Sequence, residues 1–352
     1  MIIKVHKVCI VGGGNISNTR HIPALKKTGR ADVVGVIGIS EKHILRTLEN
    51  NNKIKNSCVF EDIDQLSKLG WLNEVDSVVI GTPPRDHFKM ARTCLELDKH
   101  VLLEKPFTMN TGEAETLIEL AKSKNKVLAV MHNFQYANNF IKLEKLVKEG
   151  VIGEVYSFNE IQYSNKTRRL PVWYNELPLG LFYDEAPHFI YLLQKLGGEI
   201  EIQNVFRHAD PDPERNTPVL LNVNLKAGGI PANIFINFNS PVCEWLFIVS
   251  GSTKLAIYDL FRDILITIPN DGLHLAKNVL SNSLHTTIKH WMGNITNGFR
   301  VLTGNLLYGQ DRVMHLYFDM IDQHIDVPEI NGYSGWKNVR LLNEIAHLTT
   351  LT

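Results

Sequence analysis

The sequence predicts an α/β fold with two domains, and three patterns support this prediction. Short apolar strands alternate with amphipathic helices in the first part of the chain, which favours a parallel sheet. A glycine-rich turn joins the first strand to the first helix, and later strands cluster without helices between them. The 352 residues suffice for two domains. We predict a first domain over 1–132 and an α+β second domain over 133–352.

The first domain should contain six strands, and the residues after each strand are the candidates for a binding site. Ligands of an open α/β sheet bind beyond the carboxyl ends of its strands. The predicted strands are 7–11, 33–37, 59–60, 76–80, 101–105 and 126–131. Helices are expected near 17–27, 42–51, 62–69, 85–97 and 108–124.

A glycine turn follows the first strand. Gly12 permits a tight turn, and Gly14 lets a pyrophosphate approach the backbone, where a helix N-terminus supplies amide donors. Ser17 replaces the third glycine of GxGxxG and is small enough to pack helix against strand. In this position the pattern favours a dinucleotide site over a structural turn. The expected contacts are Gly12, Gly14, Asn15 and Ile16.

The end of the second strand bears on the choice between NAD and NADP. An NAD site usually has an acidic residue there, which binds the adenosine ribose hydroxyls. Here Ser40 and Lys42 flank Glu41, so a hydroxyl and an ammonium are available for a 2′-phosphate. The alternative is that Ser40 caps a helix and the charges are solvated. The sequence leans slightly toward NADP, and NAD or NADP is the expected cofactor.

Three further strand ends carry candidate residues. Small residues and prolines after the fourth strand leave room for a flat ligand, and the fifth strand stops at Lys105 because Pro106 follows. Lys105 is either a reactive group at the lip of a ligand crevice or a surface lysine. The candidates at these three ends are Thr82, Pro83, His87, Glu104, Lys105 and Asn133.

The second part of the chain is expected to contain a sheet and a helix that carries polar residues. Strands are predicted near 153–162, 219–225, 233–238, 245–250, 254–259 and 264–268, helical structure within 272–307, and a closing helix over 336–348. Asp184 and His188 are four residues apart and would share one face of a helix that has Pro187 in its first turn. Taken alone, such a histidine is more often a buried structural residue.

Composition narrows the function classes. Lysine plus arginine and aspartate plus glutamate both number 37, which argues against a nucleic-acid partner. The four cysteines are far apart and suggest neither a metal site nor a disulfide scaffold. No apolar run is long enough for a membrane span, and the N-terminus leads into a strand instead of a signal peptide. We therefore expect a cytoplasmic protein without metal, nucleic acid or membrane contact.

Several of these motifs occur in one order and at one set of separations that resembles a known family. The motifs are Val11–Gly14, Ile80–Pro84 with His87, His100–Pro106, Asn133–Tyr136 and Gly150–Val155. Together they are similar to the glucose-fructose oxidoreductase / inositol dehydrogenase / MocA family of sugar oxidoreductases. The resemblance implies a Rossmann domain followed by an open, mostly antiparallel sheet that binds substrate and often builds a homodimer or homotetramer.

The resemblance also implies a catalytic set. The family uses the lysine of Glu-Lys-Pro with an Asp and a His spaced by four, and Lys105, Asp184 and His188 match these positions. On this basis His188 is the general base, Lys105 stabilises the developing oxyanion, and Asp184 orients His188 or binds a hydroxyl. Many members have an Asp three residues after the His, where this chain has Tyr191.

The substrate is expected to be a sugar, with sugar phosphates and nucleotide sugars as candidates. The expected substrate contacts, besides the catalytic residues, are Tyr136, Arg168 and Trp173. Arg168 and Arg169, with Lys166, are either a phosphate site or a solvated basic loop, and Trp173 either stacks on a sugar or packs. Two rival functions stay open: a glycosidase or lyase that uses nicotinamide transiently, and a non-catalytic sugar or dinucleotide sensor.

Overall fold

The computed structural model describes residues 4–168 and 170–350, and these form two compact units. The first unit contains the chain up to Asn133 together with Gly309–Leu341, and the second contains Phe134–Tyr308 and the residues from Leu342. The segment 309–341 therefore belongs with the first unit, although the sequence analysis grouped it with the second domain. Its backbone joins the first sheet, since the Val130 N–H donates to Ile330 O at 2.7 Å.

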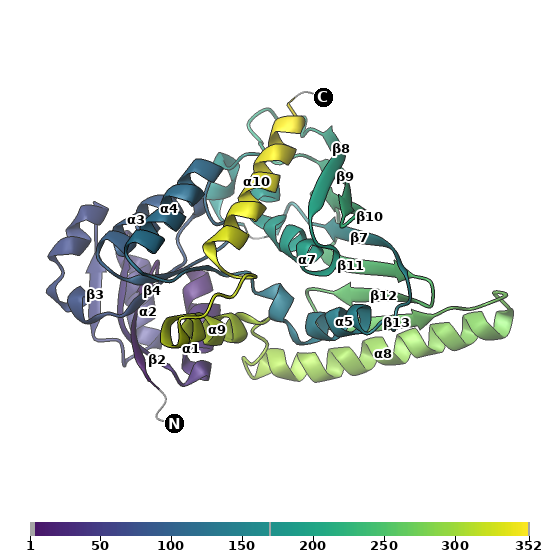
Figure 1. Cartoon of the computed structure of the whole chain (residues 1–352), viewed down its shortest axis with the longest axis horizontal. Coiled ribbons are helices and arrows are strands. Elements are labelled where there is room, and N and C mark those ends of the chain that lie inside the picture. The colour runs from purple at the N-terminus through teal and green to yellow at the C-terminus, as the bar shows by residue number, and fades with distance from the viewer. Residues whose placement is uncertain (1–3, 169, 351–352) are drawn as a thin grey trace. The chain divides into compact units, whose positions relative to one another are not determined.

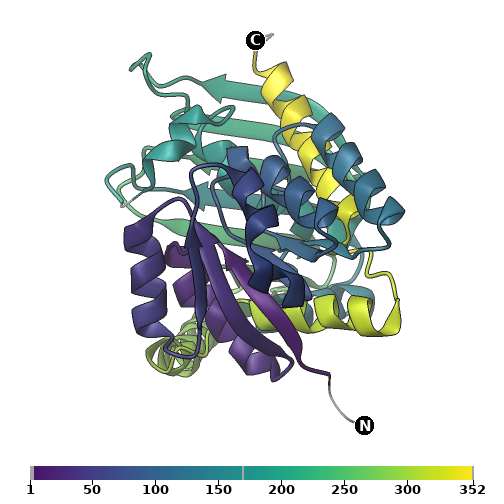
Figure 2. The same cartoon turned by 90° about the vertical axis from the view of Figure 1, so that its left-hand side faces the viewer.

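The first unit is built on a six-stranded parallel sheet with the strand order β3-β2-β1-β4-β5-β6. Figure 2 shows these strands, in purple and blue, flanked by helices. The strands are β1 His6–Val11, β2 Ala31–Gly38, β3 Asn56–Val59, β4 Ser77–Ile80, β5 His100–Leu103 and β6 Leu128–Val130. This order reverses direction between β1 and β4, which is where Rossmann folds bind dinucleotides. The predicted Rossmann fold is confirmed.

Side-chain caps explain where two helices of this unit begin. Ser40 accepts a hydrogen bond from the His43 N–H at the start of α2, and Asn110 accepts one from the Glu113 N–H at the start of α4. The helical segments are η1 Ser17–His21, α1 Ile22–Thr28, α2 Glu41–Asn50, η2 Ile63–Lys68, η3 Gly70–Glu74, η4 Pro84–Asp86, α3 His87–Glu96, α4 Thr111–Ser123, α9 Gln310–Gln323 and the first part of α10 Gly332–Leu348.

Helix α9 was not predicted from the sequence. It is fixed to the first unit by Arg30, whose guanidinium pairs with Asp319 at 2.6 Å and Asp322 at 2.8 Å, and by His6, whose ring stacks on Phe318. The ion-paired residues are 289 and 292 positions apart in the chain and the stacked rings are farther apart still, so local periodicity carried no sign of them.

The second unit contains a seven-stranded sheet with the order β13-β12-β11-β7-β10-β9-β8 (Figure 1). All neighbours are antiparallel except β7 and β10. The strands are β7 Val155–Tyr163, β8 Ile200–His208, β9 Leu220–Ala227, β10 Ile230–Asn237, β11 Glu244–Gly251, β12 Lys254–Asp259 and β13 Ile264–Pro269. The predicted mostly antiparallel sheet is confirmed, although β8 was missed.

The helical segments of the second unit include the predicted excursion at 272–307, which forms the long helix α8 Ala276–Leu302. The others are η5 Phe134–Tyr136, α5 Asn138–Lys148, η6 Val172–Glu176, α6 Leu181–Glu185 and α7 Pro187–Gly197. Within the described residues, every helix falls short of the length and apolarity that a membrane span needs.

Candidate functional site

The predicted cofactor contacts all lie at the carboxyl edge of the first sheet. They follow β1 (Gly12, Gly14, Asn15, Ile16), β2 (Ser40, Lys42), β4 (Thr82, Pro83, His87), β5 (Glu104, Lys105) and β6 (Asn133). Because parallel strands end at the same edge, topology alone gathers residues that are far apart in sequence. The ends of β1 and β4 are hydrogen-bonded neighbours at the reversal point, so the glycine turn and the Thr82 loop lie side by side.

Gly12 occupies a position that only glycine fits. Its φ is +95°, and an added Cβ would lie 2.9 Å from Gly81 O in the next strand end. The Gly12 N–H donates to Ile37 O at 2.7 Å, and the Ser17 hydroxyl donates to Gly12 O at 2.5 Å. Ser17 is fully buried, so it packs at the third glycine position as predicted.

Asn18 fixes the glycine turn from the helix side, and sequence reasoning did not identify it. Its amide nitrogen lies 3.1 Å from Gly13 O, 3.0 Å from Gly14 O and 2.9 Å from Thr47 Oγ1. A Cβ on Gly13 would lie 2.9 Å from the same Thr47 oxygen, so the turn also packs directly on α2. An asparagine in the first turn after GxG could have been recognised as a donor to turn carbonyls.

Two features of this edge fit a dinucleotide. No atom described in the structure lies within 4 Å of where a Cβ on Gly14 would stand, so a ligand can reach this backbone. The Thr82 hydroxyl is buried and has no hydrogen-bond partner among the described residues. A buried polar atom without a partner is costly, and a ligand group that pairs with it would remove the cost. The open backbone at Gly14 therefore suits the pyrophosphate of a dinucleotide, and the Thr82 hydroxyl suits another polar group of the same ligand.

Glu104 and His21 form a buried pair beside Lys105. His21 Nε2 lies 2.8 Å from Glu104 Oε1, and the other carboxylate oxygen accepts the Lys105 N–H at 3.1 Å. Burial alone would raise the pKa of Glu104, but the hydrogen bond and charge of His21, with the charge of Lys105, hold that pKa below its usual value. Glu104 therefore stays ionised and fixes the backbone at Lys105, next to a cis Lys105–Pro106 bond.

His87 connects two of the loops. Its Nδ1 lies 2.8 Å from Pro106 O, and its Nε2 lies 3.0 Å from Thr82 O. Burial is the largest influence on the pKa of His87 and lowers it, although both carbonyls favour the protonated form. Because backbone carbonyls occupy both ring nitrogens, the geometry suits a residue that positions the loops; direct contact with a cofactor stays a prediction.

Ser40 and Lys42 remain compatible with either cofactor. The Ser40 hydroxyl accepts the His43 N–H at 3.4 Å, so it does cap α2, as one of the two alternatives proposed. Lys42 is exposed in the first turn of that helix, beside exposed Glu41. A hydroxyl that accepts one long hydrogen bond can still donate to a phosphate, so the cap does not decide between NAD and NADP.

In the second unit, His188 sits in an aromatic enclosure. The rings of Phe134 and Trp245 lie 4.8 Å and 5.7 Å from the imidazole, measured between centroids. His188 Nδ1 lies 2.8 Å from the Tyr191 hydroxyl, which accepts the Phe134 N–H at 3.0 Å. Tyr191, three residues after His188, therefore orients the imidazole through its hydroxyl.

Trp245 is a candidate contact that the sequence analysis missed. It lies on β11, and its indole N–H is buried without a hydrogen-bond partner in the described parts of the chain. Since its ring neighbours that of His188, the free donor is available to a polar ligand there. No local signal marks such a tryptophan, because a strand's alternation predicts burial but not which polar atoms lack partners.

Asp184 and His188 lie on two short helices instead of one. Helix α6 ends at Glu185 and α7 begins at Pro187, with Ala186 between them in helical geometry. Pro187 lacks an N–H, so the helical ladder is interrupted just before it, and it occupies the first turn of α7 as predicted. Asp184 is half-buried one turn before His188.

Arg168 is engaged inside the protein. Its guanidinium forms an ion pair with the buried Glu185, which also accepts from Gln162. Burial raises the pKa of Glu185 and the charge of Arg168 opposes this. A guanidinium neutralised in this way is a weaker candidate for a phosphate contact. Arg169, its predicted companion, lies outside the described residues.

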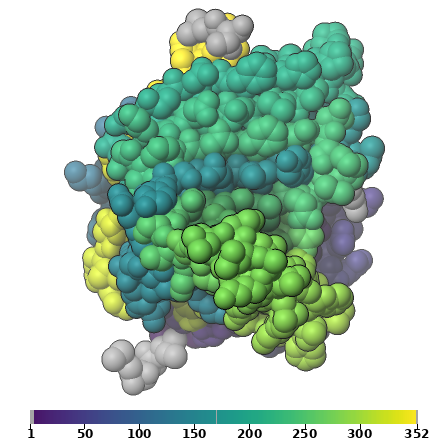
Figure 3. Space-filling view, turned by 90° about the vertical axis from the view of Figure 1, so that its right-hand side faces the viewer, coloured from purple at the N-terminus to yellow at the C-terminus, as the bar shows by residue number. Residues whose placement is uncertain are grey.

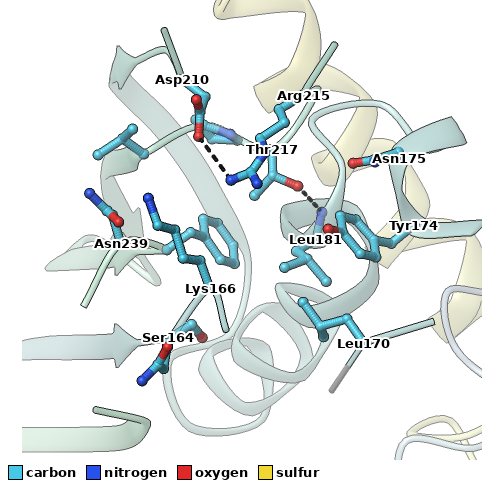
Figure 4. A pocket seen from close by; sticks show the side chains of 14 residues that line it. Ser164, Lys166, Leu170, Tyr174, Asn175, Leu181, Asp210, Arg215, Thr217 and Asn239 are labelled. Atoms are coloured by element: carbon cyan, nitrogen blue, oxygen red, sulfur yellow. Dashed lines mark hydrogen bonds and ion pairs between the residues drawn. The ribbon is translucent and has the colours of Figure 1, made fainter. Parts of the chain in front are cut away.

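Lys166 lines a surface pocket of the second unit together with Tyr174 and Arg215 (Figure 4). Arg215 pairs there with Asp210 at 3.8 Å, and Thr217 accepts the Leu181 N–H at 3.0 Å. Neither Arg168 nor the half-buried Trp173 is part of the described lining.

Tyr136, another predicted substrate contact, ends η5, directly before α5. The described residues contain no cluster of three or more His, Cys, Asp or Glu that would hold a metal.

Comparison with known proteins gives a family match for the first part of the chain. Residues 6–132 match the model described as an oxidoreductase family with an NAD-binding Rossmann fold, Gfo/Idh/MocA. The match covers 127 of the 352 residues, so the chain is similar to this family over the part that forms the first sheet. The predicted NAD(P)-binding Rossmann domain is thereby confirmed.

Relatives and a solved structure are also similar to this chain. The chain is 30% identical over 189 residues to the oxidoreductase YdgJ of Escherichia coli K12 (52% of this chain, 51% of that protein). It is 28% identical over 187 residues to the scyllo-inositol 2-dehydrogenase (NADP(+)) IolW of Bacillus subtilis 168 (52% and 49%). The match thus spans about half the length of these relatives. A levoglucosan dehydrogenase in complex with NADH has the same fold, with a TM-score of 0.75, 16% identity and coverage of 99% and 97%.

Proposed function

We propose that this chain is an NAD(P)-dependent oxidoreductase of the Gfo/Idh/MocA family and moves a hydride between nicotinamide and a ring hydroxyl or ketone of a sugar. The observation that carries the proposal is the buried Glu104–His21 pair, which fixes Lys105 at the carboxyl edge where this fold binds its dinucleotide. A lysine held this way is pre-organised for charge stabilisation. The relatives named for inositol support a polyhydroxylated ring as the substrate.

The first unit would hold the cofactor through its strand ends. The backbone at Gly14 is open to the pyrophosphate, and Thr82 offers a buried hydroxyl. The bound nicotinamide would supply or accept the hydride. The slight preference for NADP rests on the sequence at Ser40 and Lys42, which the helix cap leaves open, and Asn133, buried just after β6, is a further candidate contact. Titration with both reduced cofactors tests this preference; a strong NAD preference would contradict it.

Lys105, Asp184 and His188 would carry the chemistry, as the family resemblance implies. Hydride leaves a carbinol carbon only as the hydroxyl proton departs, and a base with a near-neutral pKa removes this proton well. With Nδ1 of His188 held by Tyr191, Nε2 is the ring nitrogen that would exchange a proton with substrate. The Lys105 ammonium would stabilise the alkoxide oxygen, and Asp184 would orient a neighbouring hydroxyl or His188.

The substrate class is proposed to include sugar phosphates and nucleotide sugars. A relative named UDP-N-acetylglucosamine 3-dehydrogenase, from Acidithiobacillus ferrooxidans, is 42% identical over 73 residues, which supports testing nucleotide sugars. In the second unit, Lys166 lines a pocket and offers a cationic group for an anionic substituent, beside Arg215, which is paired with Asp210. Tyr136, Trp173 and Trp245 are the aromatic candidates for contact with a sugar face.

A screen of sugars and sugar nucleotides tests the proposal against its two rivals. The protein is mixed with each compound and NAD⁺ or NADP⁺, and both cofactor reduction and substrate turnover are followed. A dehydrogenase reduces cofactor in proportion to product. Cleavage or elimination of the sugar without net reduction of cofactor would indicate transient oxidation, and tight binding with no turnover of any compound would indicate a sensor.

The proposal also includes a homodimer or homotetramer as the assembly and the cytoplasm as the location.

A further inference from the structure

Helix α8 exposes its apolar side, which is the reverse of the usual arrangement for a surface helix. Among its 27 residues only Asn297 is buried. The large apolar side chains of α8 are mostly exposed. The helix runs beside β13 in the second unit (Figure 1) and stands out from the strands in light green (Figure 3). A helix built this way normally has a partner on its apolar side.

The polar side of α8 is the side that packs on its own unit. Asn297 donates to both Arg262 O and Asp263 O at 2.7 Å, at the turn before β13. One turn earlier, a Cβ on Gly293 would lie 2.7 Å from the Ile264 side chain, so the helix backbone is pressed against the strand. These contacts fix the rotation of α8, and its apolar side is therefore held outward.

Six residues make up the exposed α8 stripe, and each is between 49% and 71% exposed: Leu280, Leu284, Ile288, Trp291, Ile295 and Phe299. Residues spaced by three and four lie on one face of a helix. The successive spacings are 4, 4, 3, 4 and 4, so the stripe reads the same from either end. Its midpoint falls between residues 289 and 290.

The area of the stripe is close to what a stable dimer buries. Aliphatic side chains carry roughly 100 Å² of apolar area and aromatic ones roughly 200 Å². At the observed exposures the six residues present roughly 500 Å², and the adjoining exposed Met292 and Leu302 bring this to roughly 700 Å². A standard interface buries about 800 Å² per partner, whereas the largest apolar patch of a monomer is usually about 300–600 Å².

We propose that the α8 stripe pairs with the α8 stripe of a second copy of this chain, antiparallel about a two-fold axis near residues 289 and 290. The symmetric spacing then brings Leu280 opposite Phe299, Leu284 opposite Ile295, and Ile288 opposite Trp291. A two-fold interface needs a surface that is complementary to itself, and this stripe meets that condition.

The charges of α8 favour this arrangement over two others. The helix contains Lys277, Lys289 and Arg300 but no acidic residue. Parallel pairing would place Lys277, which projects on the same side as the stripe, against its own copy, whereas antiparallel pairing separates the two. A helix that lies on a lipid surface has a strongly basic polar face; the polar side of α8 carries Asn297 and Gly293 and packs on β13.

The mass in solution tests the proposal with two matched variants of the full chain. Ile295→Asp places a charge in the stripe, and Thr296→Asp places the same charge on the next residue, outside it. We expect the wild-type protein and Thr296→Asp to have twice the mass of Ile295→Asp in sedimentation at equal concentration. The dissociation constant should rise about 30-fold or more in Ile295→Asp. Equal dinucleotide binding by all three proteins shows that each is folded.

Two results would overturn the proposal. The first is equal mass for wild type and Ile295→Asp, and the second is binding of wild type, but not Ile295→Asp, to phosphatidylserine vesicles without a change in mass. Orientation is tested in a Cys58→Ser, Cys243→Ser background. The pair Leu284→Cys with Ile295→Cys should form intermolecular disulfides, and Leu280→Cys alone should not; disulfides through Leu280→Cys would indicate parallel pairing.

Discussion

Asn18 offers the sharpest test of how the glycine turn is held. Its side-chain amide faces Gly13 O, Gly14 O and Thr47 Oγ1 at 2.9–3.1 Å. With two N–H groups it makes two good hydrogen bonds at a time, and each contributes about 0.5–1.5 kcal/mol. Asn18→Ala should therefore lower the free energy of unfolding by about 1–3 kcal/mol. If this rigidity sets the turn for the pyrophosphate, the dissociation constant for cofactor rises about 5- to 150-fold.

The control is Thr19→Ala, on the adjacent helical residue. The Thr19 hydroxyl donates to Asn15 O at 2.8 Å and is exposed, so its loss should change stability by less than about 0.5 kcal/mol. Urea denaturation gives the stability, and fluorescence titration with NADH and NADPH gives the affinity. If Asn18→Ala is destabilised but binds cofactor as tightly as wild type and Thr19→Ala, the turn is not the element whose rigidity controls binding.

Two other substitutions have defined outcomes. Tyr191→Phe removes the hydroxyl between His188 Nδ1 and the Phe134 N–H. We expect kcat to fall about tenfold with unchanged cofactor affinity, and the free energy of unfolding to fall by about 1–3 kcal/mol. An unchanged kcat would exclude Tyr191 as a positioning residue. Burial raises the pKa of Glu160 well above 4.5. Folded Glu160 therefore keeps its proton, whereas unfolding at higher pH releases it. The contribution of Glu160 to the free energy of unfolding is thus full below about pH 4.5 and declines as pH rises. Glu160→Gln should be the more stable protein at neutral pH, with the gap closing toward pH 4.5; parallel pH profiles from chemical denaturation would contradict this.

Much of the first unit could be predicted because its signals are local. The strands of the parallel sheet other than β3 are short apolar runs bounded by turns, and the site residues follow these runs directly; β3 Asn56–Val59 is mostly polar and was predicted at 59–60. The Gly12 turn needed only a glycine at a strand end, and the Gly81–Pro84 segment only small residues and prolines. Sheet topology then brings these ends to one edge, so a correct strand list gave the correct neighbourhood.

The residues that were missed act through partners distant in sequence. His21 lies in the π-helical segment η1, and its significance comes from Glu104, 83 positions later. Helix α9 belongs to the first unit through Arg30 and His6, which no periodicity reveals. Strand β8 was overlooked because its alternation is weak: Glu201, Asn204 and Phe206 are all exposed. In each case tertiary contacts, not local preference, determine the outcome.

The candidate catalytic residues of the second unit were predicted from the family pattern, whereas the side chains that surround them were not. Asp184 and His188 matched by spacing, but the proline break between α6 and α7 and the enclosure by Phe134 and Trp245 appear only in the folded unit. For Arg168 the sequence left open a phosphate contact or a solvated loop, and neither alternative included its partner in the structure, the buried Glu185.

The central claim is that the lysine of the Glu-Lys-Pro segment performs chemistry on a substrate and is not merely structural. Lys105→Met retains a side chain of similar length without its charge, and the hydrogen bond between His21 and Glu104 remains, so the variant should still bind NAD(P)H. Single-turnover oxidation of a sugar identified by the screen should then slow by a factor of about 10² or more. Single turnover at close to the wild-type rate, with normal cofactor binding, would contradict the account.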